Sequence, residues 1–194
     1  MAAPIVGVLA LQGDFEAHQR AFERAGADAV QVRTAAELQK IAGLVIPGGE
    51  STTMLKLLHL MNLMEPLREF IAAKPVFGTC AGAILLAKEV LNPPQESFGA
   101  MDLTVERNGY GRQAESRVTR ISPGASFAER MGAGDMEAVF IRAPIIRRAG
   151  AAATVLAEYE GNPVLVEQGR HMVATFHPEL TQDTRVHKLF LSKL

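Results

Sequence analysis

Three short aliphatic segments, each followed by a glycine-containing turn and a stretch with helical character, most constrain how this chain folds. They cover residues 5–9, 44–46 and 75–77. β-Branched, aliphatic runs bounded by turn formers are typical of parallel strands buried on both faces. Residues 15–25 carry apolar side chains at helical spacing and stop at Gly26, which predicts a helix with a glycine terminator. This alternation indicates a three-layer α/β/α architecture.

Other stretches of the first half extend the pattern. Val30 and Val32 fit a further strand, and residues 37–41 fit a short helix. Residues 51–64 are apolar except for three polar side chains spaced three residues apart, which places the polar groups on one narrow stripe and predicts a mostly buried helix. Residues 81–90 predict a helix that begins directly after the third aliphatic strand.

The sequence pattern of the second half predicts strands that are separated by glycine-rich or polar turns. We expect some of these strands to be antiparallel additions to a mostly parallel sheet. They cover residues 103–106, 139–141, 154–159, 164–167 and 172–176. A chain of 194 residues, 48% of them hydrophobic, is long enough to bury one sizeable core. No repeat or linker divides it, so we expect one domain over residues 1–194.

Charge and cysteine content exclude several classes of protein. The chain has 20 basic and 21 acidic residues, so no strong field draws it to nucleic acid or to an anionic membrane, and small molecules or proteins are the expected partners. One cysteine forms neither an internal disulfide nor a cysteine-rich zinc site, which favours a cytoplasmic location. The N-terminus has no basic leader, and no apolar run approaches the roughly 20 residues of a membrane span.

The single cysteine, Cys80, lies in the sequence Gly-Thr-Cys-Ala-Gly at residues 78–82, the thiol counterpart of a serine nucleophile elbow. A nucleophile between a strand and a helix takes a strained backbone conformation, and flanking glycines remove the side chains that would collide there. The N-terminus of the helix favours a thiolate and supplies donors to an oxyanion. A lone cysteine is more often a packing residue, so the flanking glycines are what favour a catalytic role.

His177 and Glu179 directly follow the predicted strand at residues 172–176. In extended backbone these two side chains share a face, so the carboxylate can orient the imidazole as a general base for the thiol. The pattern predicts a Cys-His-Glu triad. Taken alone, His-Pro-Glu also fits a surface turn with proline at its centre, and its pairing with Cys80 is what gives it weight.

A glycine-rich loop, Pro-Gly-Gly-Glu-Ser at residues 47–51, follows another predicted strand. Its paired glycines let backbone amides point at a ligand, so we expect an oxyanion-binding role. The same loop also fits an ordinary connection between a strand and a helix. It lacks the lysine and the spacing of a phosphate-binding loop.

Six stretches of the chain, in consistent order over nearly its whole length, resemble the glutaminase subunits of pyridoxal 5'-phosphate synthase, which are class I, triad-type glutamine amidotransferases. They are residues 11–13 (LQG), 47–54 (PGGESTTM), 77–82 (FGTCAG), 105–108 (VERN), 140–144 (FIRAP) and 176–181 (FHPELT). The resemblance implies a flavodoxin-like glutaminase fold and hydrolysis of L-glutamine to L-glutamate and ammonia. It also implies delivery of the ammonia to a separate, barrel-shaped synthase subunit that makes the vitamin B6 cofactor. No cofactor or metal is implied for this chain.

The resemblance also assigns roles to individual residues. It makes Cys80 the nucleophile, His177 its base and Glu179 the residue that orients the base, which are the roles expected from their spacing. It places a further set at the glutamine site, with Gln12 nearby: Gly49, Glu50, Ser51, Arg107, Ile141 and Arg142. Such a set suits a free amino acid, whose carboxylate binds a cation and hydrogen-bond donors.

The mechanism expected from these roles is attack of the Cys80 thiolate on the glutamine carboxamide, with the amides of Gly49 and Ala81 stabilising the oxyanion. His177 protonates the departing ammonia and then activates water to hydrolyse the thioester. The alternatives are a class I glutaminase that serves another synthase, a thiol peptidase or hydrolase on the same fold, and a silent subunit that only binds glutamine or a partner.

Several residues fall outside this scheme. His18, His59, His171 and His187 show no metal-ligand spacing, so we expect surface or packing roles for them. The sequence also departs from the family pattern at two places: Gly-Tyr follows Asn108 where Ser-Phe is expected, and Arg117 occupies a position expected to be apolar. Neither departure touches the triad.

Overall fold

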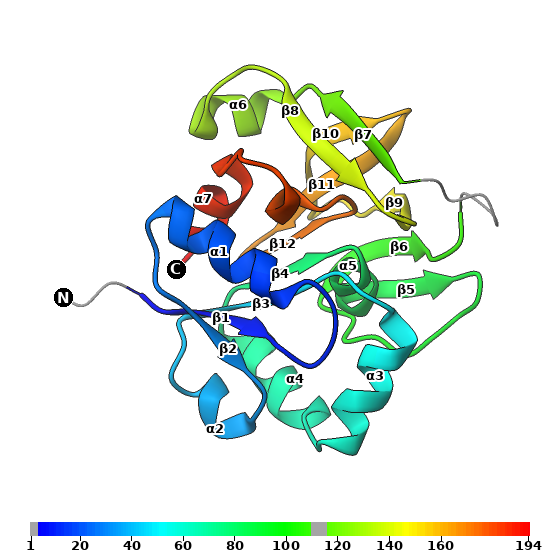
Figure 1. The fold of residues 1–194 in the computed structure, drawn as a ribbon. Helices are drawn as coiled ribbons and strands as arrows, with labels where there is room; N and C mark the ends of the chain where they lie inside the picture. The colour runs from blue at the N-terminus through cyan, green and yellow to red at the C-terminus, as the bar shows by residue number, and fades with distance from the viewer. Residues whose placement is uncertain (1–3, 110–115) are drawn as a thin grey trace.

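The computed structural model describes residues 4–109 and 116–194. Its centre is a seven-stranded sheet with the strand order β10-β11-β12-β4-β3-β1-β2 (Figure 1). Five neighbouring strands are parallel: β1 (Val6–Leu9), β2 (Ala29–Val32), β3 (Gly43–Ile46), β4 (Val76–Thr79) and β12 (His171–Ala174). The antiparallel strands β10 (Thr154–Tyr159) and β11 (Asn162–Gln168) extend one edge. This confirms the predicted mostly parallel sheet with antiparallel additions.

Helices cover both faces of this sheet, as the predicted three-layer architecture requires. The helices α1 (Phe15–Ala25) and α7 (Arg185–Leu191) lie side by side on one face (Figure 1). The other layer contains α2 (Ala35–Leu38), α3 (Ser51–Leu60), α4 (Met64–Ala73) and α5 (Ala81–Leu86). Successive side chains of a strand point to opposite faces, so β3 contributes to the hydrophobic core on each side of the sheet.

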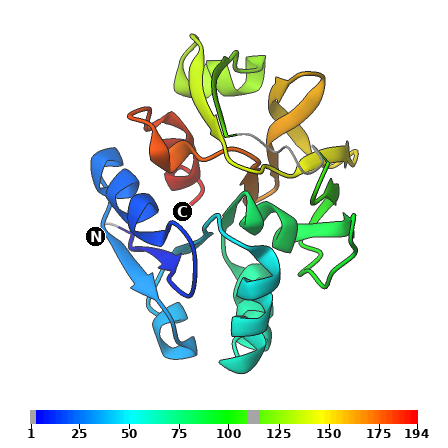
Figure 2. The same cartoon turned by 45° about the vertical axis from the view of Figure 1, so that its right-hand side comes forward.

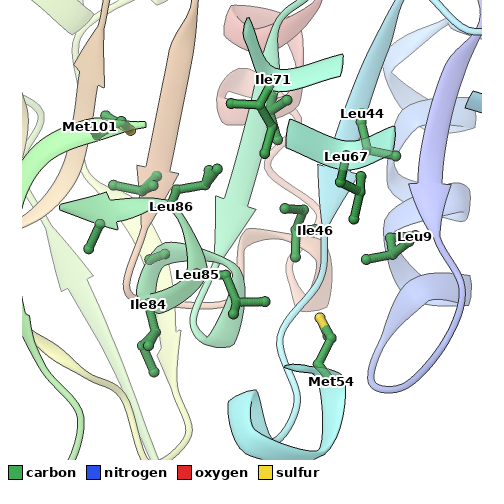
Figure 3. Close-up of a cluster of buried hydrophobic side chains, with 14 of the residues drawn as sticks. Leu9, Leu44, Ile46, Met54, Leu67, Ile71, Ile84, Leu85, Leu86 and Met101 are labelled. Carbon is green, nitrogen blue, oxygen red and sulfur yellow. The ribbon is translucent and has the colours of Figure 1, made fainter. Parts of the chain in front are cut away.

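The two hydrophobic cores show this alternation directly. Leu44 and Ile46 of β3 pack with Leu67 of α4 and Leu85 of α5 (Figure 3). Val45, between them, belongs to the opposite core with Phe22, Phe77 and Phe190. Because both faces of the central strands are apolar, the sheet is covered on both sides, and only the ends of its strands are open to a ligand.

The remaining strands form two small sheets outside the central one. β5 (Ala87–Leu91), β6 (Met101–Glu106) and β9 (Ile145–Ala149) make one, and β7 (Arg117–Ile121) pairs with β8 (Met136–Phe140) in the other. The β7–β8 pair and the helix α6 (Ala125–Met131) lie at one end of the molecule, away from α3 and α4 (Figure 2). The strands predicted at 103–106 and 139–141 therefore exist but do not belong to the central sheet.

Three predictions about helices differ from the structure. The short helix expected over 37–41 is α2, at Ala35–Leu38. The helix expected over 51–64 ends at Leu60, and only Ser51, Met54 and Leu58 of α3 are buried. Leu60 is 77% exposed, because a single stripe of this helix packs inward and its apolar composition does not reveal which stripe that is. The helix expected over 81–90 stops at Leu86, and the next five residues form β5, because pairing with β6 outweighs their local helix propensity.

Some elements were not anticipated from the sequence: α4, α6, α7, β7 and β9. Arg117, the departure from the family pattern, begins the exposed strand β7 and donates to the Tyr159 hydroxyl and the Glu160 carboxylate, which explains how a charge is accommodated there. The other departure covers residues 109 and 110, of which residue 110 lies outside the described residues. None of the described helices combines the length and apolar character needed to cross a membrane.

Candidate active site

Three loops meet at the carboxyl ends of β3, β4 and β12. These strands are parallel neighbours, with β4 between the other two, so their carboxyl ends lie at the same edge of the sheet. The loop after β3 carries residues 47–51, the turn after β4 carries Cys80, and the segment after β12 carries His177 and Glu179. Parallel α/β proteins commonly bind ligands at this edge.

The turn at Cys80 has the strained geometry that the sequence predicts. Cys80 has φ 48° and ψ −102°, a conformation that residues with a side chain rarely adopt. A Cβ atom on Gly78 would lie 2.5 Å from the backbone of Gly82, and one on Gly82 would lie 2.1 Å from the carbonyl oxygen of Ile46. The Cys80 N–H donates to the carbonyl of Ala174 in β12 at 2.9 Å, which anchors the turn to the sheet.

His177 and Glu179 form a buried pair beside this turn. His177 Nδ1 lies 2.7 Å from Glu179 Oε1, and each residue is only 3% exposed. Residues 178–180 form a short 3-10 helix, so the pair meets across a tight turn and not along an extended strand as expected. Because Glu179 occupies Nδ1, the free Nε2 of the ring is the atom available to the thiol.

Cys80 and His177 line one cavity of about 360 Å³. The Cys80 sulfur faces the carbonyl oxygen of Ile141 at 3.9 Å, and His177 Nε2 has no hydrogen-bond partner among the described residues. Burial lowers the pKa of His177, but the nearby Cys80 sulfur and the Glu179 carboxylate raise it more, so the net shift of this pKa is upward. The geometry thus places a readily protonated imidazole beside a thiol.

The glycine-rich loop closes one side of the cavity. Gln12 Oε1 accepts a hydrogen bond from the Glu50 N–H at 2.9 Å. A Cβ atom on Gly49 would lie only 2.3 Å from the same oxygen. The Glu50 carboxylate caps α3 by accepting from the N–H groups of Thr52 and Thr53. Burial raises the pKa of Glu50, but hydrogen bonds from the Thr53 hydroxyl and from these two N–H groups outweigh burial and lower the pKa to about 2. The carboxylate is therefore engaged with the helix.

Arg107, at the end of β6, reaches this loop from the neighbouring sheet. Its Nη2 donates to the Thr52 hydroxyl at 2.7 Å and lies 3.6 Å from Glu50 Oε1. Its side chain is 14% exposed, so it is not the solvated surface charge that an arginine is by default. Arg142, which also lines the cavity, has φ 44° and is exposed.

The structure brings most of the predicted site residues together around this cavity. Its lining contains Gln12, Gly49, Glu50, Ser51, Cys80, Arg107, Ile141, Arg142 and His177. Glu179 lies behind His177, and Ala81 is fully buried in the first turn of α5. The lining residues not anticipated from the sequence are Gly13, Asp14, Ile84 and Asn108. Gly13 and Asn108 are part of the family-like stretches, which is the signal that could have found them.

Asp14 is the charged member of that unanticipated group. Its Oδ2 lies 3.8 Å from His177 Nδ1. Among the described residues, Asp14, His177 and Glu179 offer atoms within 4.8 Å of one another that could in principle hold a metal ion. The imidazole nitrogen concerned already pairs with Glu179, and we assign no metal to the site.

Two of the four unassigned histidines lie directly behind the pair. His18 and His187 are fully buried, and His18 Nε2 lies 3.3 Å from Glu179 Oε2. The expected packing role therefore does not fully describe His18, because this residue also contacts the Glu179 carboxylate. His59 is exposed beside Glu96, and His171 accepts a hydrogen bond from the Val76 N–H at 3.3 Å.

The fold is that of a class I glutamine amidotransferase. The structure is similar to one described as "Crystal structure of glutamine amidotransferase", with a TM-score of 0.87, 43% sequence identity and 97% of each chain covered. The chain belongs to the SNO glutamine amidotransferase family, whose profile matches residues 8–194.

Similarity to curated relatives extends over nearly the whole chain. The chain is 62% identical to the "Pyridoxal 5'-phosphate synthase subunit PdxT" of Solibacter usitatus, covering 97% of this chain and 98% of that protein. It is 57% identical to the protein of the same name from Koribacter versatilis, covering 96% and 93%. The crystal structure of a glutamine amidotransferase from Thermotoga maritima has a TM-score of 0.63 at 13% identity, with 99% and 84% covered, which shows a shared fold.

Proposed function

We propose that this protein hydrolyses L-glutamine to L-glutamate and ammonia with Cys80, His177 and Glu179, and supplies the ammonia to a pyridoxal 5'-phosphate synthase. The observation that carries the chemistry is the common cavity lined by Cys80 and His177, with Glu179 hydrogen-bonded behind the imidazole. The relatives named as PdxT support the biosynthetic context.

The reaction begins with attack of the Cys80 sulfur on the carboxamide carbon of glutamine. His177 in its protonated form gives its Nε2 proton to the departing ammonia, which leaves a thioester on Cys80. The neutral imidazole then takes a proton from water as the water oxygen attacks the thioester carbon. This attack breaks the bond to the Cys80 sulfur and releases L-glutamate. Because Glu179 holds Nδ1, the same nitrogen, Nε2, serves both half-reactions.

Stabilisation of the tetrahedral intermediate is assigned to the backbone amides of Gly49 and Ala81. Ala81 is the first residue of α5, where N–H groups lack partners within the helix. Gly49 lies on the opposite loop, next to Gln12. Donors fixed at both sides of the developing negative charge contribute about 3 to 4 kcal/mol each in comparable enzymes.

Recognition of the amino-acid end of glutamine is assigned to other residues that line the same cavity. Arg107 is held by Thr52 with its guanidinium at the cavity wall, where it can bind a carboxylate. Ser51, Ile141 and Arg142 complete the wall, and Glu50 shapes it, because its carboxylate caps α3 and its N–H donates to Gln12. A cavity of about 360 Å³ suits one amino acid better than the extended groove of a peptidase.

The proposed partner is a barrel-shaped synthase subunit in a hetero-oligomer, in keeping with the word "subunit" in the names of the PdxT relatives. A cytoplasmic location stays a prediction.

Release of glutamate from L-glutamine tests the proposal, with the chain alone and mixed with a pyridoxal 5'-phosphate synthase barrel subunit. The matched blank is Cys80→Ala, which removes only the sulfur. We expect Cys80-dependent hydrolysis that rises with the synthase. Hydrolysis that does not respond to the synthase would instead favour another synthase as partner. Absence of hydrolysis in both conditions would favour a silent subunit, or a peptidase if a peptide substrate were cleaved.

A further inference from the structure

His18, in the middle of α1, is a fully buried histidine that contacts the far side of the Glu179 carboxylate. Its Nε2 lies 3.3 Å from Glu179 Oε2 and 2.9 Å from the Thr79 hydroxyl oxygen. We propose that His18 is a positioning residue of the active site, which directs an Nε2–H toward Glu179 and so holds the carboxylate against His177. This inference rests on the proposed triad.

The Glu179 carboxylate needs a second donor. Oε1 faces His177 at 2.7 Å, whereas Oε2 is buried and has no aligned hydrogen bond from any described residue. A buried carboxylate oxygen without a donor costs free energy, so a nearby N–H group is strongly favoured to turn toward it. His18 Nε2, at 3.3 Å, is shared between this oxygen and the better-aligned Thr79 hydroxyl.

A neutral ring at residue 18 has one N–H group, so its tautomer decides what it offers to Glu179. Burial lowers the pKa of His18, and the Glu179 carboxylate opposes this only in part. The ring is therefore neutral above about pH 6.5. Two tautomers are open to it, with the proton on Nδ1 or on Nε2.

His187 distinguishes these tautomers. His18 Nδ1 lies 3.3 Å from His187 Nε2, and His187 Nδ1 is buried without a partner among the described residues. Suppose that His18 carried its proton on Nδ1 and donated it to His187 Nε2. The neutral His187 would then carry its proton on Nδ1, as a buried N–H with no acceptor, and the lone pair of His18 Nε2 would face the carboxylate. The opposite direction leaves only a lone pair unpaired, which costs less.

The favoured arrangement is therefore a chain of donors that runs toward the active site. His187 Nε2–H donates to His18 Nδ1, and His18 Nε2–H points at Thr79 and Glu179. The Glu179 carboxylate then receives a donor on each oxygen, one from His18 and one from His177. Without His18 the carboxylate can rotate, and His177 loses its fixed orientation toward Cys80.

Two substitutions separate positioning from packing. His18→Met keeps an apolar volume but offers no donor, whereas His18→Gln places an amide N–H near the position of Nε2. We expect His18→Met to lower kcat about 10- to 100-fold with KM within about twofold of the wild type. The alkaline limb of its pH profile should move to lower pH, because the imidazolium of His177 loses part of its stabilisation. His18→Gln should recover most of the loss.

The matched controls are His171→Gln, at a partly buried histidine remote from the site, and Cys80→Ala. A His18→Met enzyme with kcat within twofold of the wild type would overturn the inference, as would equal losses in both His18 variants with an unchanged pH profile. If Cys80→Ala kept full activity, the triad itself would be wrong. Loss in Cys80→Ala with full activity in His18→Met would remove only the role of His18.

A measurement on the unaltered protein keeps the inference testable if the variants do not fold. In the nitrogen-15 NMR spectrum of histidine-labelled protein at about pH 7.5, chosen to keep His18 neutral, both His18 and His187 should appear as the Nε2–H tautomer. Finding the proton of His18 on Nδ1 would reverse the donor chain and overturn the inference, whatever the kinetics.

Discussion

Gly48 lies directly against the imidazole of His177. A Cβ atom on residue 48 would lie 2.4 Å from His177 Cε1 and 3.3 Å from the Cβ of Cys80. Real Cβ atoms do not approach a ring so closely, because the overlap is strongly repulsive. The absence of a side chain at Gly48 thus leaves room for the imidazole of His177 beside Cys80.

Gly48→Ala should therefore displace His177 and abolish most of the glutaminase activity. We expect at least about a 100-fold fall in kcat, because general acid–base catalysis contributes about 100- to 10,000-fold. A steady-state glutaminase assay and a melting curve check this. Gly161→Asn, in an open turn with φ 76°, is the control and should leave activity unchanged. Normal turnover in Gly48→Ala would show that the ring can move aside at no cost.

Gly82→Ala should destabilise the whole protein. The added methyl group would lie 2.1 Å from the Ile46 carbonyl oxygen, a backbone atom that cannot rotate away. Overpacking of this kind costs about 1 to 3 kcal/mol, and we expect the upper end of that range. Chemical denaturation measures the free energy of unfolding. An unchanged midpoint would mean that α5 shifts relative to β3 without loss.

Arg107→Met should raise KM for glutamine more than it changes kcat. Removing a charged hydrogen-bond donor from a ligand carboxylate costs about 1.5 to 3 kcal/mol, so KM should rise about 10- to 100-fold. Arg117→Met is the matched control, since that side chain bonds to Tyr159 and Glu160 far from the cavity. Equal effects of both substitutions on KM would exclude a direct contact of Arg107 with the substrate.

The buried histidines whose pKa values are lowered, His18 and His187, should make the protein sensitive to mild acid. Burial lowers the pKa of His187 to about 3, so between about pH 6.5 and 3 the unfolded chain binds a proton that the folded chain does not. Its contribution to stability is complete above about pH 6.5 and is lost as the pH falls toward 3. His18 and His171 also have lowered pKa values, for which burial is likewise the main cause.

His187→Leu should flatten this dependence. The free energy of unfolding, measured by denaturant at about pH 7 and pH 5, should fall by about 1 to 2 kcal/mol less in the variant than in the wild type. Comparing the two pH values within each protein removes the constant cost of the substitution. Carboxylates with lowered pKa values act mainly below about pH 4.5, which leaves this window to the histidines. Equal slopes in both proteins would contradict a neutral buried His187.

The central strands and the elbow at Cys80 were predictable from the sequence because their signals are local. A parallel strand buried on both faces needs an unbroken aliphatic run, as in β3. A strained turn between a strand and a helix needs small neighbours, and Gly78 and Gly82 supply them two residues to either side of Cys80. Arg107 was predictable only through resemblance, because its partner Thr52 lies in another part of the chain.

Residues 87–91 and His18 mark where local signals fail. The first segment has good helix formers, yet pairing with β6 makes it a strand. Nothing near His18 in the sequence distinguishes it from a core histidine, since its partners Glu179 and His187 are more than 150 residues away.

The sequence by itself determined the layered α/β class, the turn at Cys80 and the pairing of His177 with Glu179, because short-range sterics and spacing specify them. The tertiary structure alone decided that α3 buries only one stripe, that Arg107 reaches the loop at Glu50, and that His18 lies behind Glu179. The physical reason is that these contacts join segments far apart in the chain, and only the packing of the helices and of β6 around the central sheet brings them together.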